Sequence, residues 1–269
     1  FISDSSVYSG DATGLGGGVY CANGGTVLLE SGRIGDNTAT SGGGLYLDDC
    51  LFNSFAGSVV DAVCPTGGSG VVCNRAESTG GGIYATNGAS VNLIGSAAAP
   101  ATVAENDADE GGGLYLTGAG TTADSTDAWI VDNQGAFEGG AVYARAGASF
   151  TMDIADPDCR GSRCSLMRNN FSAIAGCVGG AIAADSGADV VVHQTTLTGN
   201  NANVTGSVVF AEDPGTTVAM EGCLIYANSG SLNDAYLDTV DGAVLTVAFT
   251  TVAEGVGCCK GLFDTNSNS

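Results

Sequence analysis

The sequence Gly42-Gly43-Gly44-Leu45-Tyr46 is one copy of a glycine phrase that recurs along the chain. Further copies begin at Gly16, Gly80 and Gly111, and copies with alanine as the third residue begin at Gly139 and Gly179. Counted from the third residue of each copy, successive copies lie 26, 38, 31, 28 and 40 residues apart. A period in this range, varied by insertions, is typical of a solenoid in which each repeat packs on its neighbours.

A second phrase places an apolar residue three positions before an asparagine. We expect the apolar residue to point into the core and the asparagine to occupy a tight corner, where it tolerates left-handed backbone torsions. Asparagines at equivalent corners of successive rungs can stack as an amide ladder. The pairs are Ile34–Asn37, Val71–Asn74, Val103–Asn106, Ile130–Asn133, Leu166–Asn169, Leu197–Asn200 and Ile225–Asn228.

Residues 16–41 contain the clearest repeat unit. The glycines lead into an extended run at 19–21, and two more extended runs follow at 26–30 and 33–35, each after a turn. Asp36-Asn37-Thr38 then closes the unit before the next glycines. Three short strands in one unit suit a rung of a parallel β-helix, whose rungs stack about 4.8 Å apart. The glycine positions are corners where a side chain would collide with the next rung.

These markers predict an all-β protein: a single-domain parallel β-helix solenoid of about eight rungs, roughly 40 Å long. We expect the β-helix domain to span residues 1–255. Disulfide-bearing loop insertions are expected near 50–73 and 153–177, and residues 256–269 are expected to form a C-terminal cap or tail.

The ten cysteines favour disulfides in an oxidising compartment. A metal site is the weaker alternative, because the chain has one histidine and no CxxC pair. The adjacent Cys258 and Cys259 are expected to pair with different partners. The sequence does not fix the full connectivity. The candidate pairs are Cys64 with Cys73, Cys159 with Cys164, and Cys21 with Cys50.

The charge is strongly acidic, with 7 basic and 29 acidic residues and a formal net charge of −22. Such a chain repels phosphate backbones and anionic lipid, so neither nucleic acid nor a membrane surface is an expected partner. No apolar run of about 20 residues is present to insert into a membrane.

Acidic clusters occur at Asp48-Asp49, Asp107-Asp109-Glu110 and Asp153-Asp156-Asp158, and we expect the first two at turns. No EF-hand loop occurs, so no cofactor or metal site is predicted, with structural calcium as the alternative. His193 is the only histidine and lies in an alternating run typical of a strand face, so we expect it to be structural rather than a catalytic base. No catalytic residue is predicted.

Five tyrosines follow the glycine phrases at a constant offset: Tyr20, Tyr46, Tyr84, Tyr115 and Tyr143. They should form a column along one face. If the preceding apolar residues point inward, strict alternation turns the tyrosines outward. An exposed aromatic column is a candidate binding surface for sugars or a protein partner. The alternative is a stack covered by the inserted loops.

The two phrases resemble the repeats of chlamydial polymorphic membrane proteins and related autotransporter passenger domains. Gly139-Gly140-Ala141-Val142 and Gly179-Gly180-Ala181-Ile182 are the closest matches to the first repeat of that family. The resemblance spans about residues 1–230. It implies a right-handed parallel β-helix, secretion and a structural or adhesive role at a surface, and it implies no catalytic residues.

We therefore expect a secreted, extracellular structural or adhesive protein of a cell surface and not an enzyme. Its expected partners are further copies of itself, other cell-surface proteins or glycans. Phe1 opens within a rung, which suggests either a filament subunit that stacks head to tail or a piece of a longer chain. A polysaccharide lyase or hydrolase on a β-helix scaffold is the rival function, and a carbohydrate-binding module is a third.

Overall fold

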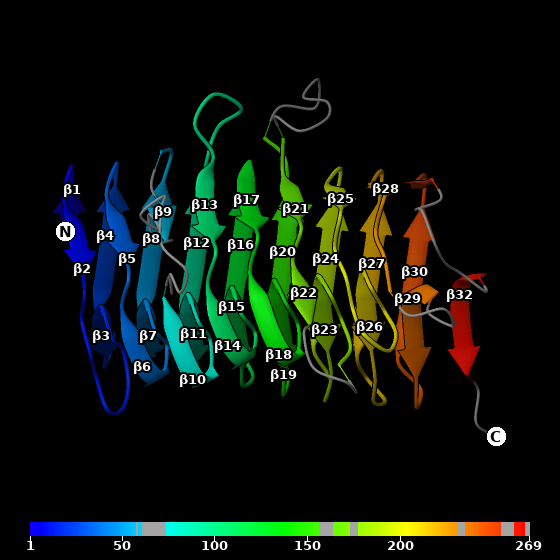
Figure 1. The fold of residues 1–269 in the computed structure, drawn as a ribbon, viewed down its shortest axis with the longest axis horizontal. Coiled ribbons are helices and arrows are strands. Elements are labelled where there is room, and N and C mark those ends of the chain that lie inside the picture. Colours follow the sequence, from blue (N-terminus) through cyan, green and yellow to red (C-terminus); the bar gives the residue numbers. More distant parts are fainter. Residues whose placement is uncertain are drawn as a thin grey trace.

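The computed structural model is an all-β parallel solenoid of about eight turns, which confirms the predicted fold class. It describes residues 1–57, 59–60, 74–155, 164–172, 177–230, 235–253 and 261–266. Every regular element in these ranges is a strand. No helix long and apolar enough to cross a membrane occurs in them. Figure 1 shows the rungs standing side by side along the long axis of the rod.

The strands form four parallel sheets, which we name A to D in the order that the chain visits them within a rung. Sheet A contains β1 (Ile2–Ser3), β4 (Thr26–Glu30), β8 (Leu51–Phe55), β12 (Ser90–Ile94), β16 (Thr122–Thr126), β20 (Ser149–Asp153), β24 (Asp189–His193), β27 (Thr217–Glu221) and β30 (Val244–Ala248). Sheet B contains β2 (Ser6–Tyr8), β5 (Arg33–Gly35), β9 (Val59–Val60), β13 (Ala101–Ala104), β17 (Ala128–Val131), β21 (Leu166–Arg168), β25 (Thr196–Thr198), β28 (Leu224–Tyr226) and β31 (Thr251–Val252).

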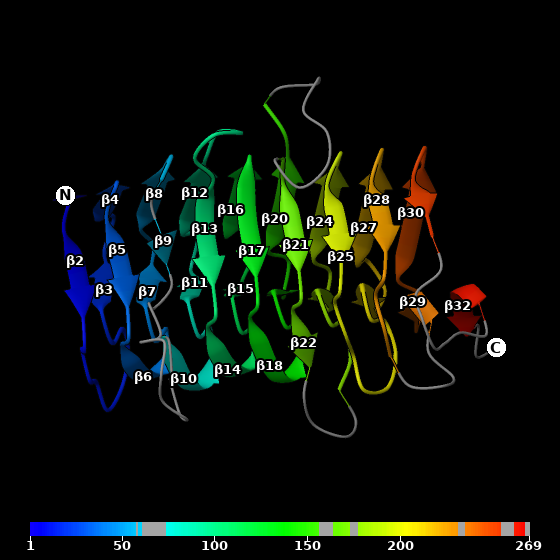
Figure 2. The same ribbon diagram turned by 45° about the horizontal axis from the view of Figure 1, so that its top comes forward.

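Sheet D continues every rung, whereas sheet C adds a fourth strand to five of the described rungs, and Figure 2 shows sheet C as a separate row along one edge of the rod. Sheet C contains β6 (Thr38–Ser41), β10 (Arg75–Thr79), β14 (Asp107–Glu110), β18 (Gln134–Glu138) and β22 (Phe171–Ser172). Sheet D contains β3 (Val19–Ala22), β7 (Leu45–Asp48), β11 (Ile83–Thr86), β15 (Leu114–Thr117), β19 (Val142–Arg145), β23 (Ile182–Ala184), β26 (Val209–Ala211), β29 (Ala235–Val240) and β32 (Gly261–Asn266).

Sheet C corrects the expectation of three strands per rung. The sequence pattern predicts that the unit closes at Asp36-Asn37-Thr38, but residues 38–41 pair in parallel with β10. The same sheet corrects the placement of Asp107, Asp109 and Glu110, which lie in β14 rather than in a turn. These strands are polar and their register shifts within the sheet, so no apolar alternation marks them in the sequence.

The insertions are narrower than the sequence predicts. Residues 51–55 and 166–168 belong to β8 and β21, which lie within the rungs. The segment expected as a cap or tail also contributes a strand, because β32 pairs with β29 and extends sheet D. Within the predicted insertions, residues 58, 61–73, 156–163 and 173–176 lie outside the described residues.

The glycine phrase forms the corner between sheets C and D. Gly42 has a φ of +66°, a torsion that side chains with a Cβ rarely adopt. At Gly43 the torsion is ordinary, but a Cβ would lie 2.5 Å from the carbonyl oxygen of Arg75 and 2.6 Å from that of Gly81, both in the next rung. The first glycine therefore provides the turn, and the second allows the rungs to approach each other.

The corner between sheets B and C contains a ladder of buried asparagines. The Nδ2 of Asn133 donates hydrogen bonds to Oδ1 of Asn170 (3.0 Å) and to the carbonyl of Val103 (3.1 Å). Its Oδ1 accepts hydrogen bonds from the backbone N and the Nδ2 of Asn106, at 3.1 and 2.9 Å. The ladder runs through Asn37, Asn74, Asn106, Asn133, Asn170, Asn200 and Asn228.

Two details of this corner differ from the sequence analysis. The ladder residue in the fifth pair is Asn170 rather than Asn169, and the inward apolar residue is Met167 rather than Leu166. The left-handed torsion falls on the residue before the ladder asparagine wherever that residue is described, as at Asp132 (φ 58°) and Asn169 (φ 54°). That residue turns the chain with its own side chain directed outward, and the asparagine after it then points into the rod.

The interior of the rod is a continuous apolar core. In sheet A, the strands from β8 to β27 alternate between buried and more accessible residues, so that Phe150 and Met152 of β20 pack inside while Thr151 lies outside. Buried residues from successive rungs form one cluster from Cys21 to Leu237. Each rung is therefore stabilised chiefly by the rungs on either side of it.

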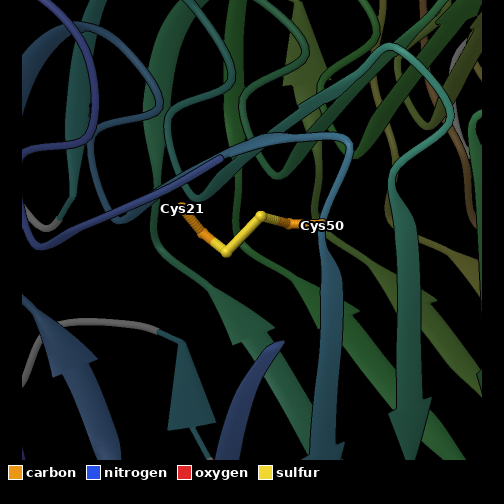
Figure 3. Close-up of a disulfide and its surroundings, with 2 residues drawn as sticks. All are labelled: Cys21 and Cys50. Carbon is orange, nitrogen blue, oxygen red and sulfur yellow. A yellow bond between two sulfur atoms is a disulfide. The ribbon is translucent and has the colours of Figure 1, made fainter. Parts of the chain in front are cut away.

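A disulfide joins the first two rungs of this core. Figure 3 shows Cys21, in β3, bonded to Cys50, which lies at the corner before β8. This is one of the pairs that the sequence suggests. Cys164 is also disulfide-bonded, whereas Cys64, Cys73, Cys159, Cys258 and Cys259 lie outside the described residues.

Candidate ligand-binding face

The outer face of sheet D carries the tyrosine column. The parallel register aligns Tyr20 with Tyr46, Tyr46 with Tyr84, and Tyr84 with Tyr115. The rings stack nearly parallel, with centroid separations of 5.5, 4.6 and 5.1 Å along the column. Most ring faces are thus occupied by neighbouring rings. The column presents ring edges and hydroxyl groups to solvent.

Exposure falls along the column from its N-terminal end. Tyr20 is 54% exposed, Tyr115 is 7% exposed and Tyr143 is 3% exposed. Burial raises the pKa of Tyr46 and of Tyr115 to about 12. The tyrosines therefore point away from the apolar core, as alternation predicts, but only the first rungs present a freely accessible aromatic surface.

The regular stack ends at Tyr143. Its ring lies at 90° to the ring of Tyr115, with the centroids 5.4 Å apart. The register explains the change: the next residue in the column is Ala183, which offers no ring, and Phe210 follows it. Tyr143, Ala183 and Tyr115 instead form a small buried apolar cluster.

A group of polar side chains surrounds this break, and we call it the polar cluster: Glu110, Glu138, Tyr143, Arg145, Asp185 and Glu212. The hydroxyl of Tyr143 donates a hydrogen bond to Oδ2 of Asp185. The Nε of Arg145 lies 3.5 Å from Oδ1 of Asp185, and its guanidinium carbon lies 5.4 Å from the centroid of the Tyr143 ring. The side chain of Asp185 is 5% exposed, so this carboxylate is almost fully desolvated.

The residues of the polar cluster come together because equivalent positions of successive rungs lie side by side. Arg145, Asp185 and Glu212 each stand two residues after the column position, so they fall in successive rungs on the same side of the column. Glu110 and Glu138 are register partners at the ends of β14 and β18, on the other side of the glycine corner.

Three acidic groups of the polar cluster have raised pKa values, which favour their protonated forms. Burial, followed by repulsion from Glu138, raises the pKa of Glu110. Burial and then the charges of Glu138 and Asp185 raise the pKa of Glu212. The pKa of the Tyr143 hydroxyl is raised well above its ordinary value by burial and by the carboxylates of Asp185 and Glu138. Such shifts concentrate at functional sites, although structural networks also produce them.

The remaining polar residues singled out in the sequence lie elsewhere. His193 is at the end of β24 on the outer face of sheet A, with Nδ1 3.6 Å from Oδ2 of Asp153 and Nε2 4.0 Å from Oε2 of Glu221. In the part of the chain that the structure describes, no group of three or more histidines, cysteines or acids is placed to hold a metal ion. Asp156 and Asp158 lie outside that part.

Sequence reasoning missed Arg145, Asp185 and Glu212. A signal for them exists: each stands a fixed number of residues after the tyrosine or after the residue that replaces it. The aspartate and glutamate resemble ordinary turn acids in the sequence, and only the stacked rungs bring them together beside Arg145.

We compared the chain with protein-family models, with curated proteins and with solved structures, and none of the three comparisons gave a match.

Proposed function

We propose that the protein is a secreted structural or adhesive β-helix of a cell surface, which binds glycan along the outer face of sheet D. The observation that carries the proposal is the alignment of an outward tyrosine column with the polar cluster on one face of the rod. The Cys21–Cys50 disulfide supports an oxidising compartment. The resemblance of both phrases to repeats of bacterial surface passengers supports the same location.

The rod suits a mechanical role because every rung is held by both neighbours. The asparagine ladder spans seven rungs inside, and the tyrosine stack spans four rungs outside. A surface built this way keeps its groups at fixed spacing, which lowers the entropy lost when an extended ligand binds.

The chemistry of the face favours a polyhydroxylated ligand. Asp185 and Glu138 only accept hydrogen bonds when ionised, Arg145 only donates them, and tyrosine hydroxyls do both. Sugar hydroxyls supply both functions in one molecule. The net charge of −22 opposes binding of uronate polymers, so we propose neutral or amino-sugar glycans.

The test is a binding assay with immobilised cellulose, chitin, chitosan and polygalacturonate. We expect retention on one or more of the first three and none on polygalacturonate. Arg145→Gln should weaken retention, whereas the matched variant Arg75→Gln, in β10 of sheet C, should not. Retention on polygalacturonate alone, or on none of the four, would contradict the proposal.

A second candidate function is glycoside hydrolysis, which the polar cluster itself favours. Hydrolysis of this kind uses one protonated carboxyl as the acid and a second carboxylate as the base or nucleophile. The raised pKa of Glu110 and the nearby carboxylates of Glu138 and Asp185 offer both states. Appearance of new reducing ends in the same incubations, lost in Glu138→Gln, would favour this function over adhesion.

A further inference from the structure

The column on sheet D lacks one ring. Its positions are occupied by tyrosine in the five successive rungs from β3 to β19, by Ala183 in β23 and by Phe210 in β26. Tyr143 and Phe210 are two rungs apart, about 10 Å along the rod. That interval holds one further ring between them, as it does between Tyr46 and Tyr115, where Tyr84 stacks at 4.6 and 5.1 Å.

The ring of Tyr143, next to the missing ring, has a different orientation from the other tyrosines of the column. It leaves the parallel stack, turns perpendicular to Tyr115 and packs with Ala183, which is 1% exposed. Its hydroxyl reaches Asp185, in the rung that lacks the aromatic residue. The space over Ala183 is therefore covered by a side chain from the neighbouring rung.

Asp185, which lies beside Ala183, has one carboxylate oxygen without a hydrogen bond in the described part of the chain. The Oδ1 of Asp185 is buried and makes no hydrogen bond with any described residue; its partner is the Nε of Arg145 at 3.5 Å. The other oxygen, Oδ2, accepts the hydrogen bond from Tyr143. Oδ1 therefore keeps an acceptor position that a ligand hydroxyl would fill.

Among the described residues, an aromatic face without a neighbouring ring also occurs at this break. A sugar ring packs its C–H groups on an aromatic face, and the stacked tyrosines from Tyr20 to Tyr115 use their faces on one another. Phe210 has Ala183 rather than a ring at the preceding column position. The break is thus where the column can offer a face to a ligand.

We propose that the Ala183 position is a binding slot for a single pyranose ring of the glycan, and that Tyr143 is its movable cover. When the cover returns to the parallel stack, the sugar lies between Tyr143 and Phe210, with Asp185 and Arg145 beside its hydroxyls. Asp185 accepts hydrogen bonds and Arg145 donates them, a combination that a polyol satisfies and a planar cation does not. This inference rests on the proposed glycan binding and gives it a location.

The test fills the slot with a side chain. Ala183→Tyr completes the column, and Ala22→Tyr makes the same substitution at the end of β3 on the same sheet, in the first rung and far from the slot. The affinities of both variants for cellohexaose and for the hexamer of N-acetylglucosamine are measured by calorimetry. We expect Ala183→Tyr to bind at least about tenfold more weakly than the wild type, and Ala22→Tyr to bind like it.

A second variant covers the case in which Ala183→Tyr does not fold. Phe210→Ala removes one wall of the slot and should weaken binding about fivefold or more, whereas Phe55→Ala, an exposed phenylalanine of β8 on sheet A, should not. In the wild type, the sugar should shift the NMR signals of the Tyr143 ring more than those of Tyr20.

The outcomes separate the two proposals. If the wild type binds a hexasaccharide and neither Ala183→Tyr nor Phe210→Ala weakens binding, the slot is wrong and glycan binding stands. If the wild type binds neither hexasaccharide nor the polysaccharides above, both are overturned. If benzamidine shifts the Tyr143 signals and no sugar does, the slot takes an aromatic cation and the inference is overturned.

Discussion

The hydroxyl of Tyr143 donates a hydrogen bond to Asp185, which lies in the next rung and is almost completely buried. The bond joins the end of the aromatic stack to the polar cluster and fixes the perpendicular ring of Tyr143. It also provides one of two partners of a desolvated carboxylate, the other being Arg145. The interaction should therefore contribute to stability as well as to the shape of the face.

Removing this hydroxyl should be measurably destabilising. Tyr143→Phe keeps the ring but leaves Asp185 with Arg145 alone, so we expect the free energy of unfolding to fall by about 1.5–3 kcal/mol. Tyr20→Phe, on an exposed ring, should change it by less than about 0.5 kcal/mol. Urea unfolding followed by circular dichroism measures both. Equal effects would show that the Tyr143–Asp185 bond is not formed in solution.

Stability should depend on pH through the buried acids. The pKa values of Asp107, Glu110 and Glu212 are raised in the folded state, chiefly by burial. The folded protein then binds these protons more tightly than the unfolded chain. Their stabilising contribution is complete below the ordinary pKa values, 3.8 for aspartate and 4.5 for glutamate, and is lost as the pH rises through the raised values.

We therefore expect a larger free energy of unfolding at pH 4.5 than at pH 7. Glu110→Gln should reduce this difference, because the amide carries no charge at either pH. Urea unfolding of both proteins at the two pH values provides the measurement. Identical pH dependence in the variant and the wild type would exclude Glu110 as a contributor.

The disulfide should stabilise the first rungs. Cys21 and Cys50 are separated by 29 residues, and closure of such a loop restricts the unfolded chain by about 3–4 kcal/mol in the entropic account. Cys21→Ser with Cys50→Ser should lower stability by about 2–4 kcal/mol. Hydrogen exchange should increase most in β3 and β7. Uniform exchange along the rod would indicate that the rungs unfold only as a whole.

The sequence predicts the solenoid fold well because the repeated residues constrain the backbone directly. A glycine such as Gly43 is required by the neighbouring rung, and an asparagine such as Asn133 is required by the ladder, so both leave periodic marks. Sheet C left no such mark, since Asp107–Glu110 is polar and irregular in register. The apolar-x-x-Asn spacing fits both Leu166–Asn169 and Met167–Asn170, and only the corner geometry distinguishes the outward asparagine from the inward one.

The site was less visible than the fold. The tyrosines are visible in the sequence because they repeat, whereas Ala183 is an ordinary residue and does not mark the break. Arg145 and Asp185 are 40 residues apart along the chain and become neighbours only through the register of β19 and β23. Residues that do not repeat, such as Arg145 and Asp185, can be recognised as neighbours only when the strand register is known.

The register of the rungs determines where every residue of the site lies, so it is the claim to test most directly. Asn170→Ala should cost about 3–5 kcal/mol of unfolding free energy, because it leaves several buried ladder groups without hydrogen bonds. Asn169→Gly, next to it, should cost less than about 0.5 kcal/mol, because glycine accepts the left-handed torsion found there. The difference between these two variants in urea unfolding is the decisive measurement. Equal costs, or a larger cost at Asn169, would contradict the account.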